Sequence, residues 1–307
     1  MHSERPVPSA MMQILKKHSL PIAMLTGVAL HPWLGQLIFV TPFTIFTMLL
    51  LTFCRMSITD FRLKSLHFVL LGIQIVGSII AYLILQPFSP LIAQAVMICM
   101  LAPPATASAV VTGMLGGDVA FTASFIFLGN MGTALATPII FAAIGSHSDL
   151  PFMFSVLTIC THVFPMLVLP LCLALFLQRT MPKAHDWLAS KTMFSFYLWG
   201  VTLAIVTGNT ANFILHQENP EYLNEILLAL SSMLICGILF FSGKALGSLF
   251  HDRISGGQAL GQKNTVFAIW IALTYSTHPL SALAPAFYVI WQNSFNAWQL
   301  WRRQRSE

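Results

Sequence analysis

The chain has 307 residues, of which 56% are hydrophobic and only 8% are charged. Soluble globular domains are much less apolar and carry about three times that charged fraction. The composition therefore leaves no room for a separate soluble domain, and the formal net charge of +5 needs no nucleic-acid partner, because loops of membrane proteins are often basic on one side. We expect an all-α polytopic protein whose surroundings are the lipid bilayer.

Apolar runs between Gly, Pro and charged residues predict the membrane-spanning helices, each of which needs about 20 residues. Ten are expected, over residues 19–31, 36–54, 66–86, 89–115, 118–146, 151–178, 190–216, 222–247, 257–277 and 282–301. Of the 15 Lys and Arg residues, all except Lys263 then fall on one side of the membrane. The opposite loops carry only the acids Asp149, Glu218, Glu221 and Glu225. Positively charged loops stay in the cytoplasm, so we expect a bacterial inner-membrane protein with both termini cytoplasmic.

Two of the expected helices are interrupted in mid-span. Pro103 and Pro104 lie inside the helix over 89–115, and prolines remove backbone donors. The helix over 257–277 opens with glycines and polar residues. Each is the fourth helix of a set of five, and paired interruptions indicate inverted repeats whose broken helices form the binding site. We therefore expect repeats over 1–146 and 147–307, with the two breaks crossing at the centre.

Lys263 lies in the second break, and a charged side chain within a membrane usually marks a substrate or ion pathway. The first half-helix should end near Gly261 and direct its carbonyl oxygens toward the ammonium group. Lys263 could replace a coupling cation, release its proton during transport or pair with an anionic substrate. Alternatively, its side chain could extend to the cytoplasmic surface.

The sequence around each break resembles the bile acid:sodium symporter family. Residues 103–118, PPATASAVVTGMLGGD, resemble its fourth-helix signature, and residues 259–268, ALGQKNTVFA, resemble its ninth-helix motif Glu-x-Gly-x-Gln-Asn-Ser-Gly-x-Ala. Trp291-Gln-Asn293 and Phe61-Arg62 match weaker motifs of the same family. The resemblance implies an organic-anion substrate and alternating access, in which a panel domain moves against a core of helices over about 66–146 and 222–301.

The chain departs from the family at its sodium ligands. By motif, an acidic ligand falls on Ala259, an amide ligand on Lys263 and a second amide on Ala109, whereas hydroxyls remain at Ser108 and Thr122. Hard cations need several oxygen ligands. We therefore expect degenerate ion sites and no sodium coupling, with Lys263 in place of the coupling cation and the proton as a candidate coupling ion.

Further polar residues near the breaks are candidates for substrate binding. With Lys263, the set comprises Thr106, Ser108, Thr112, Asn264, Gln292 and Asn293. Gln74 is a weaker candidate for the cavity, and Asn130 and His162 are expected to form hydrogen bonds between helices.

The five cysteines lie scattered in apolar runs, so we expect them to be packing residues. We expect the chain to bind neither a metal nor another cofactor.

A secondary transporter is therefore the expected function, and no enzymatic activity is expected. A membrane sensor that binds a ligand without transport is an alternative. An intramembrane hydrolase built on Ser108, His162 or His278 is a weaker alternative, because the sequence has no nucleophile motif and no carboxylate at the depth of the membrane interior.

Overall fold

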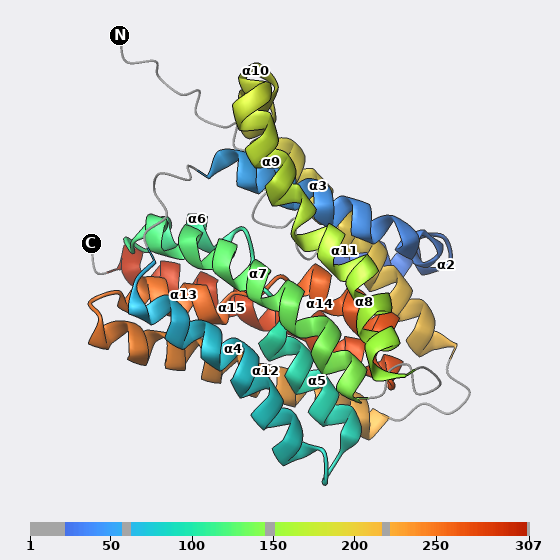
Figure 1. Cartoon of the computed structure of the whole chain (residues 1–307). Helices are drawn as coiled ribbons and strands as arrows, with labels where there is room; N and C mark the ends of the chain where they lie inside the picture. The colour runs from blue at the N-terminus through green and yellow to red at the C-terminus, as the bar shows by residue number, and fades with distance from the viewer. Residues whose placement is uncertain (1–21, 57–62, 145–150, 217–221, 306–307) are drawn as a thin grey trace.

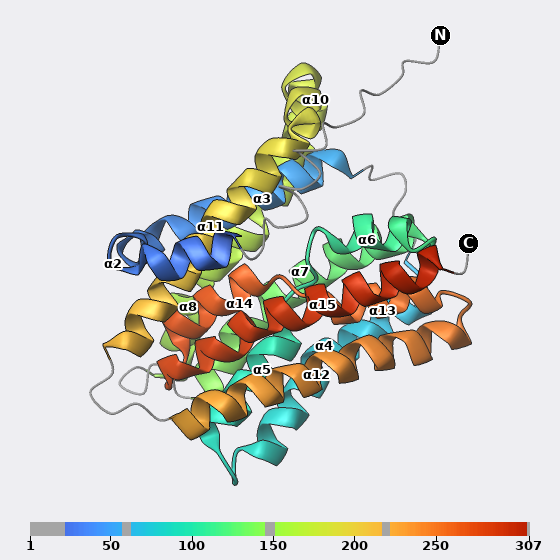
Figure 2. The same cartoon turned by 180° about the vertical axis from the view of Figure 1, so that it is seen from behind.

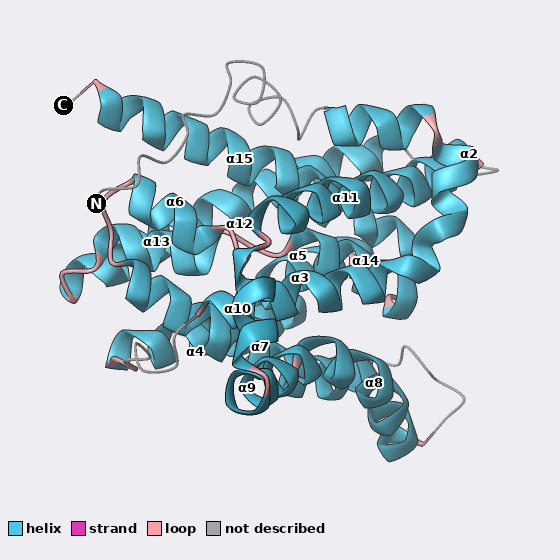
Figure 3. Cartoon of the chain, turned by 90° about the horizontal axis from the view of Figure 1, so that it is seen from above, coloured by secondary structure: helices cyan, strands magenta, loops and turns pink. Residues whose placement is uncertain are grey.

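The computed structural model of the chain describes residues 22–56, 63–144, 151–216 and 222–305. Within these ranges the protein is helical and has no strand, apart from one isolated β-bridge (Figures 1 and 3). The prediction of an all-α fold is confirmed. Several loop residues on which the predicted orientation depends lie outside the described residues, namely Arg5, Lys16, Lys17, Arg62, Asp149, Glu218 and Glu221.

The helices follow the apolar runs of the sequence. In chain order they are a helix over 22–29, α2 (His31–Leu34), η1 (Gly35–Val40), α3 (Thr41–Arg55), α4 (Ser65–Leu85), α5 (Pro90–Leu101), α6 (Ser108–Met114), α7 (Val119–Ile144), α8 (Phe152–Leu167), α9 (Leu169–Thr180), α10 (Pro182–Ser190), α11 (Thr192–Leu215), α12 (Tyr222–Leu249), α13 (Arg253–Gly261), α14 (Thr265–Tyr275), η3 (Pro279–Ala282) and α15 (Leu283–Gln304).

Five described segments are long and apolar enough to cross a membrane: 31–55, 65–85, 119–144, 152–180 and 222–249. A bent pair over 182–190 and 193–212 would make a sixth. The sequence predicts more spans than this. Two of the expected helices are each divided into shorter pieces, α5 with α6 and α13 with α14, and a helix of 12 residues such as α5 is only about 18 Å long.

The helices pack as two groups (Figures 1 and 2). In the first group, α2, η1, α3, α9, α10 and α11 contact one another. In the second, α4, α7, α12 and α15 pack around α5, α6 and α13, which are parts of the broken helices. Helices α8 and α14 contact both groups: α8 packs on α7 and on α3, and α14 packs on α15 and on α11.

The closest helix packing in the second group joins α12 to α13. A Cβ atom added at Gly256 would lie 2.5 Å from the carbonyl oxygen of Gly243, and one added at Gly247 would lie 2.5 Å from that of Asp252. Small residues allow backbones in membrane proteins to approach this closely. These glycines therefore hold the first half of the second broken helix directly against α12.

Candidate functional site

The two broken helices meet at their breaks. The chain between α5 and α6 pairs with the chain between α13 and α14 through an antiparallel bridge from Pro104 to Lys263. The Ala105 amide donates to the Gln262 carbonyl at 2.9 Å, and the Asn264 amide donates to the Pro103 carbonyl at 2.8 Å. Unwound backbone inside a membrane needs such partners. The predicted breaks and their crossing are confirmed, because each break satisfies backbone groups of the other.

Lys263 is the charged residue at this crossing, and its side chain is only 1% exposed. Its ammonium group donates to the carbonyl oxygens of Met100 at 2.9 Å and Ala102 at 3.0 Å. No acidic side chain of the described residues forms an ion pair with it. The alternative that Lys263 extends to the cytoplasmic surface is wrong, since its charged end is directed into the protein.

The carbonyl groups that hold Lys263 belong to the C-terminal end of α5. The sequence places them on its own half-helix near Gly261, and this expectation is wrong because the Gly261 carbonyl accepts a hydrogen bond from the Tyr288 hydroxyl at 2.7 Å. The last carbonyls of any helix lack partners within it and carry a partial negative charge. The ammonium group therefore gives the last carbonyl groups of α5 a hydrogen-bond donor and offsets their partial negative charge.

Two buried amide side chains fix the crossing. Gln292 accepts from the Lys263 amide at 2.9 Å and donates to the Lys263 carbonyl at 3.3 Å. Gln74 donates to the Leu101 carbonyl at 3.3 Å and to the Thr133 hydroxyl at 2.8 Å. Its own oxygen has no partner among the described residues. Gln292 therefore holds the backbone of Lys263, and Gln74 holds the end of α5.

The hydroxyl residues of α6 do not share one role. Ser108 and Thr112 are fully buried; Ser108 donates to the Ala105 carbonyl and Thr112 to the Ser108 carbonyl. Thr112 also lies 3.0 Å from the hydroxyl of Thr122 on α7. The expectation that Thr112 and Ser108 line a cavity is wrong, because hydroxyls bonded to preceding carbonyls within a packed helix are structural. Thr106 lies in the turn before α6 and is half-buried.

Among the remaining candidates, Asn264 is half-buried and caps α14, accepting from the Phe267 amide at 3.2 Å. Asn293 is also half-buried, but its amide donates to the Val289 carbonyl of its own helix at 2.7 Å. The structure therefore brings Lys263, Asn264 and Gln292 together at the crossing, and it leaves Thr106 and Asn264 partly accessible there.

Two residues expected to join helices do not do so. Asn130 donates to the Ile126 carbonyl, four residues earlier on α7, and its side-chain oxygen has no partner in the described chain. His162 is exposed, and its ring nitrogen lies 3.0 Å from the carbonyl oxygen of Thr158 on the same helix. Both predictions of interhelical bonds are wrong, because a nearby carbonyl of the same helix is the closer partner.

Two of the three positions at which the resemblance implies missing sodium ligands carry small apolar side chains. Ala259 is fully buried and Ala109 half-buried, and neither side chain offers an oxygen atom. The described residues contain no group of three or more His, Cys, Asp or Glu side chains that could hold a metal ion. Ser108 and Thr122 are the sequence-predicted hydroxyls that remain near these positions.

A charged cluster that the sequence did not suggest lies at the start of α13. The Lys64 ammonium is 2.7 Å from the Asp252 carboxylate and 3.5 Å from that of Asp118. The hydrogen bond to Asp252 raises the pKa of Lys64 above its usual value. Asp118 also accepts from the Phe121 amide at 3.0 Å, capping α7. The cluster joins the beginnings of α4, α7 and α13, and its members are too far apart in sequence to form a motif.

Comparison with known proteins adds no relative: no protein-family model matches the chain, and no curated protein matches it. Function is therefore argued from the geometry of the crossing and from the motifs around it.

Proposed function

We propose that the chain is a divergent member of the bile acid:sodium symporter family that transports an organic anion by alternating access without sodium coupling. The observation that carries the proposal is the buried ammonium group of Lys263, bonded to the carbonyls of Met100 and Ala102 where the two broken helices cross. In the family, as the motif resemblance implies, a coupling cation occupies this region. Here a covalently attached cation stands in its place.

The arrangement of charges supports an anionic substrate. The protonated side chain of Lys263 places a positive charge at the crossing, and no carboxylate among the described residues pairs with it. Charged groups within a membrane commonly line substrate pathways. The partly accessible polar groups at the crossing are those of Thr106 and Asn264. We place the substrate carboxylate beside these two residues, with the ammonium group beneath them as a fixed charge.

The packing of the helices supports alternating access. The second helix group includes α5, α6 and α13, which are three of the four halves of the broken helices, whereas α14 lies at the boundary with the first group. The crossing can therefore move with the second group against the first group, of which α3 and α11 are the longest members. Such movement of one bundle against another is the usual mechanism of transporters with broken helices. The proposal further places the chain in a bacterial inner membrane as two inverted five-helix repeats with cytoplasmic termini, on the basis of the charge bias and the paired breaks.

Sodium dependence tests the proposal directly. Organic acids are first screened for thermal stabilisation of the purified protein, and uptake of the best ligand is then measured in proteoliposomes. We expect equal binding and uptake with sodium and with choline, because Ala259 and Ala109 provide no oxygen ligands. Repeating the assay with an inward proton gradient tests whether protons are the coupling ion. Saturable sodium-driven uptake would contradict the proposal, and binding without any flux would identify a sensor instead.

The position of the substrate is tested by adding bulk at the break that precedes α6. Thr106→Trp should abolish ligand-induced stabilisation while the unliganded protein keeps its melting temperature, because the side chain is partly accessible. Thr112→Trp is the matched control, since residue 112 is fully buried and overpacking a core costs about 1–3 kcal/mol. It should lower the melting temperature. Normal ligand binding by Thr106→Trp would show that the substrate lies elsewhere.

A further inference from the structure

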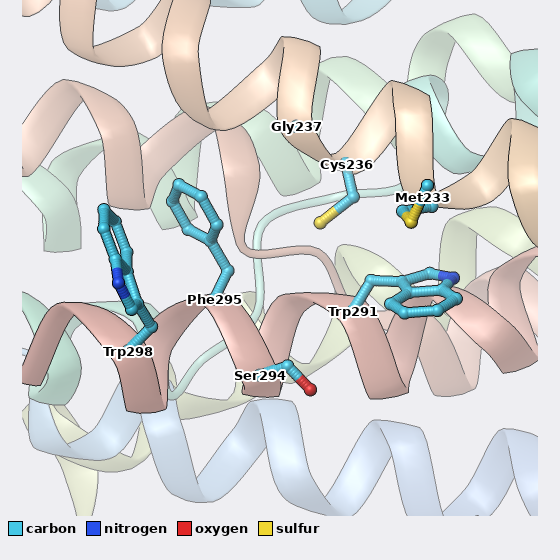
Figure 4. Close-up of a pocket in the computed structure, with 7 residues that line it drawn as sticks. All are labelled: Met233, Cys236, Gly237, Trp291, Ser294, Phe295 and Trp298. Carbon is cyan, nitrogen blue, oxygen red and sulfur yellow. The ribbon is translucent and has the colours of Figure 1, made fainter. Parts of the chain in front are cut away.

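A groove runs between α12 and α15 on the outer surface of the second helix group (Figure 4). It has a volume of about 320 Å³, which lies at the lower end of the range for ligand sites, about 300–1,000 Å³. Figure 4 shows the side chains of Trp291, Phe295 and Trp298 pointing from α15 toward α12, whereas Ser294 points away. Met233 and Cys236 point from α12 toward α15.

The groove is open rather than filled by the protein. A Cβ atom added at Gly237 would have no heavy atom within 4 Å. Met233 and Trp298, near its two ends, are each 44% exposed. The lining is therefore apolar and aromatic, and accessible from outside the helix bundle, where a membrane protein meets the acyl chains of lipids.

Positive charge gathers at one end of this groove. The Lys244 ammonium lies 5.2 Å from the centre of the Phe295 ring, and the Arg302 guanidinium lies 5.7 Å from that of Trp298. Arg302 and Arg253 are near enough to act electrostatically on Lys244. No acidic side chain of the described chain forms an ion pair with Lys244.

The length of the groove from Met233, at its far end, to Lys244, at its basic end, matches one leaflet of a bilayer. Lys244 follows Met233 by 11 positions on α12, a helical rise of about 16 Å. Half the hydrocarbon thickness of a bilayer is about 15 Å. An acyl chain that extends to Met233 would therefore place its phosphate level with Lys244.

We propose that this groove is a binding site for an anionic phospholipid, with an acyl chain against Trp291, Phe295 and Trp298 and the phosphate at Lys244 and Arg302. Basic pockets between membrane helices recognise anionic head groups in this way. The charge bias of the chain places the basic end on its cytoplasmic side. The site is separate from the helix crossing and does not depend on the transported substrate.

Native mass spectrometry of the purified protein with phosphatidylglycerol or phosphatidylcholine tests the site. We expect phosphatidylglycerol to bind preferentially. Gly237→Leu should reduce its binding about tenfold because the new side chain fills the groove, and Gly72→Leu is the matched control because Gly72 on α4 also has open space around it. Lys244→Gln should reduce binding about fivefold, whereas Lys183→Gln on exposed α10 should not.

Three results would overturn the proposal. One is equal binding of both lipids, since the basic end would then contribute nothing. Another is equal loss in Gly237→Leu and Gly72→Leu, which would show that the lipid does not occupy the groove. The third is a dimer of the unmodified protein that Gly237→Leu dissociates, because a second copy of the chain would then be the occupant.

Discussion

Replacement of Lys263 with alanine is expected to weaken binding of the transported anion by about a hundredfold or more. The proposal pairs the ammonium group with the substrate carboxylate, and loss of one member of a buried charged pair costs about 3–5 kcal/mol. The variant also leaves the carbonyl groups of Met100 and Ala102 without the ammonium donor that they have in the structure. Each such buried group costs about 1–3 kcal/mol, so the unliganded protein should also melt at a lower temperature.

The alanine variant tests separately whether Lys263 acts as a tethered cation. Small cations such as methylammonium or sodium should enter the space vacated by the side chain and restore part of the stability and binding. Lys263→Met is the matched control, because methionine fills most of the volume but carries no donor and leaves no space for a cation. Titration calorimetry and melting temperatures report both effects. Unchanged anion affinity in Lys263→Ala would contradict a role for the charge in binding.

The sequence was sufficient to predict the two breaks because their signals are local, whereas their crossing was expected from the matching positions of the breaks in the two halves of the chain. Two consecutive prolines must interrupt a helix, and the run from Gly256 to Asn264 is too polar to continue one within a membrane. The first break lies at the prolines, between Leu101 and Ser108. The second covers only the end of the polar run, between Gly261 and Thr265, because Gly256 to Gly261 remain helical in α13. The all-α fold followed from the apolar runs for the same reason.

The partners at the crossing could not be predicted because they are distant backbone atoms. Met100 precedes Lys263 by 163 residues and contributes only its carbonyl oxygen, which any residue type would provide. The role of Thr112 was misjudged for a related reason. A hydroxyl at helical spacing can face a cavity or bond to the preceding turn, and only the packing of α6 against α7 distinguishes these outcomes.

The second large effect is expected at the contact between α12 and α13. Gly256→Leu should destabilise the protein by about 3 kcal/mol, the upper end of the usual cost of overpacking, because a Cβ atom at this position lies 2.5 Å from the Gly243 carbonyl oxygen and 3.1 Å from the Gly247 Cα. These are backbone atoms of a 28-residue helix, so they cannot move aside as a flexible side chain would.

The change should also disturb the site, because α13 leads directly into Lys263. A shift of α13 away from α12 would draw the ammonium group off the carbonyls of α5 and remove ligand-induced stabilisation. Thermal unfolding should show a melting temperature lower by at least about 5 °C, with Gly256→Ala giving a smaller decrease. Gly237→Leu, on the same helix α12 but with open space around it, should melt like the unmodified protein. A normal melting temperature for Gly256→Leu would show that α12 does not hold α13, so that the crossing depends on the bonds between the two breaks alone.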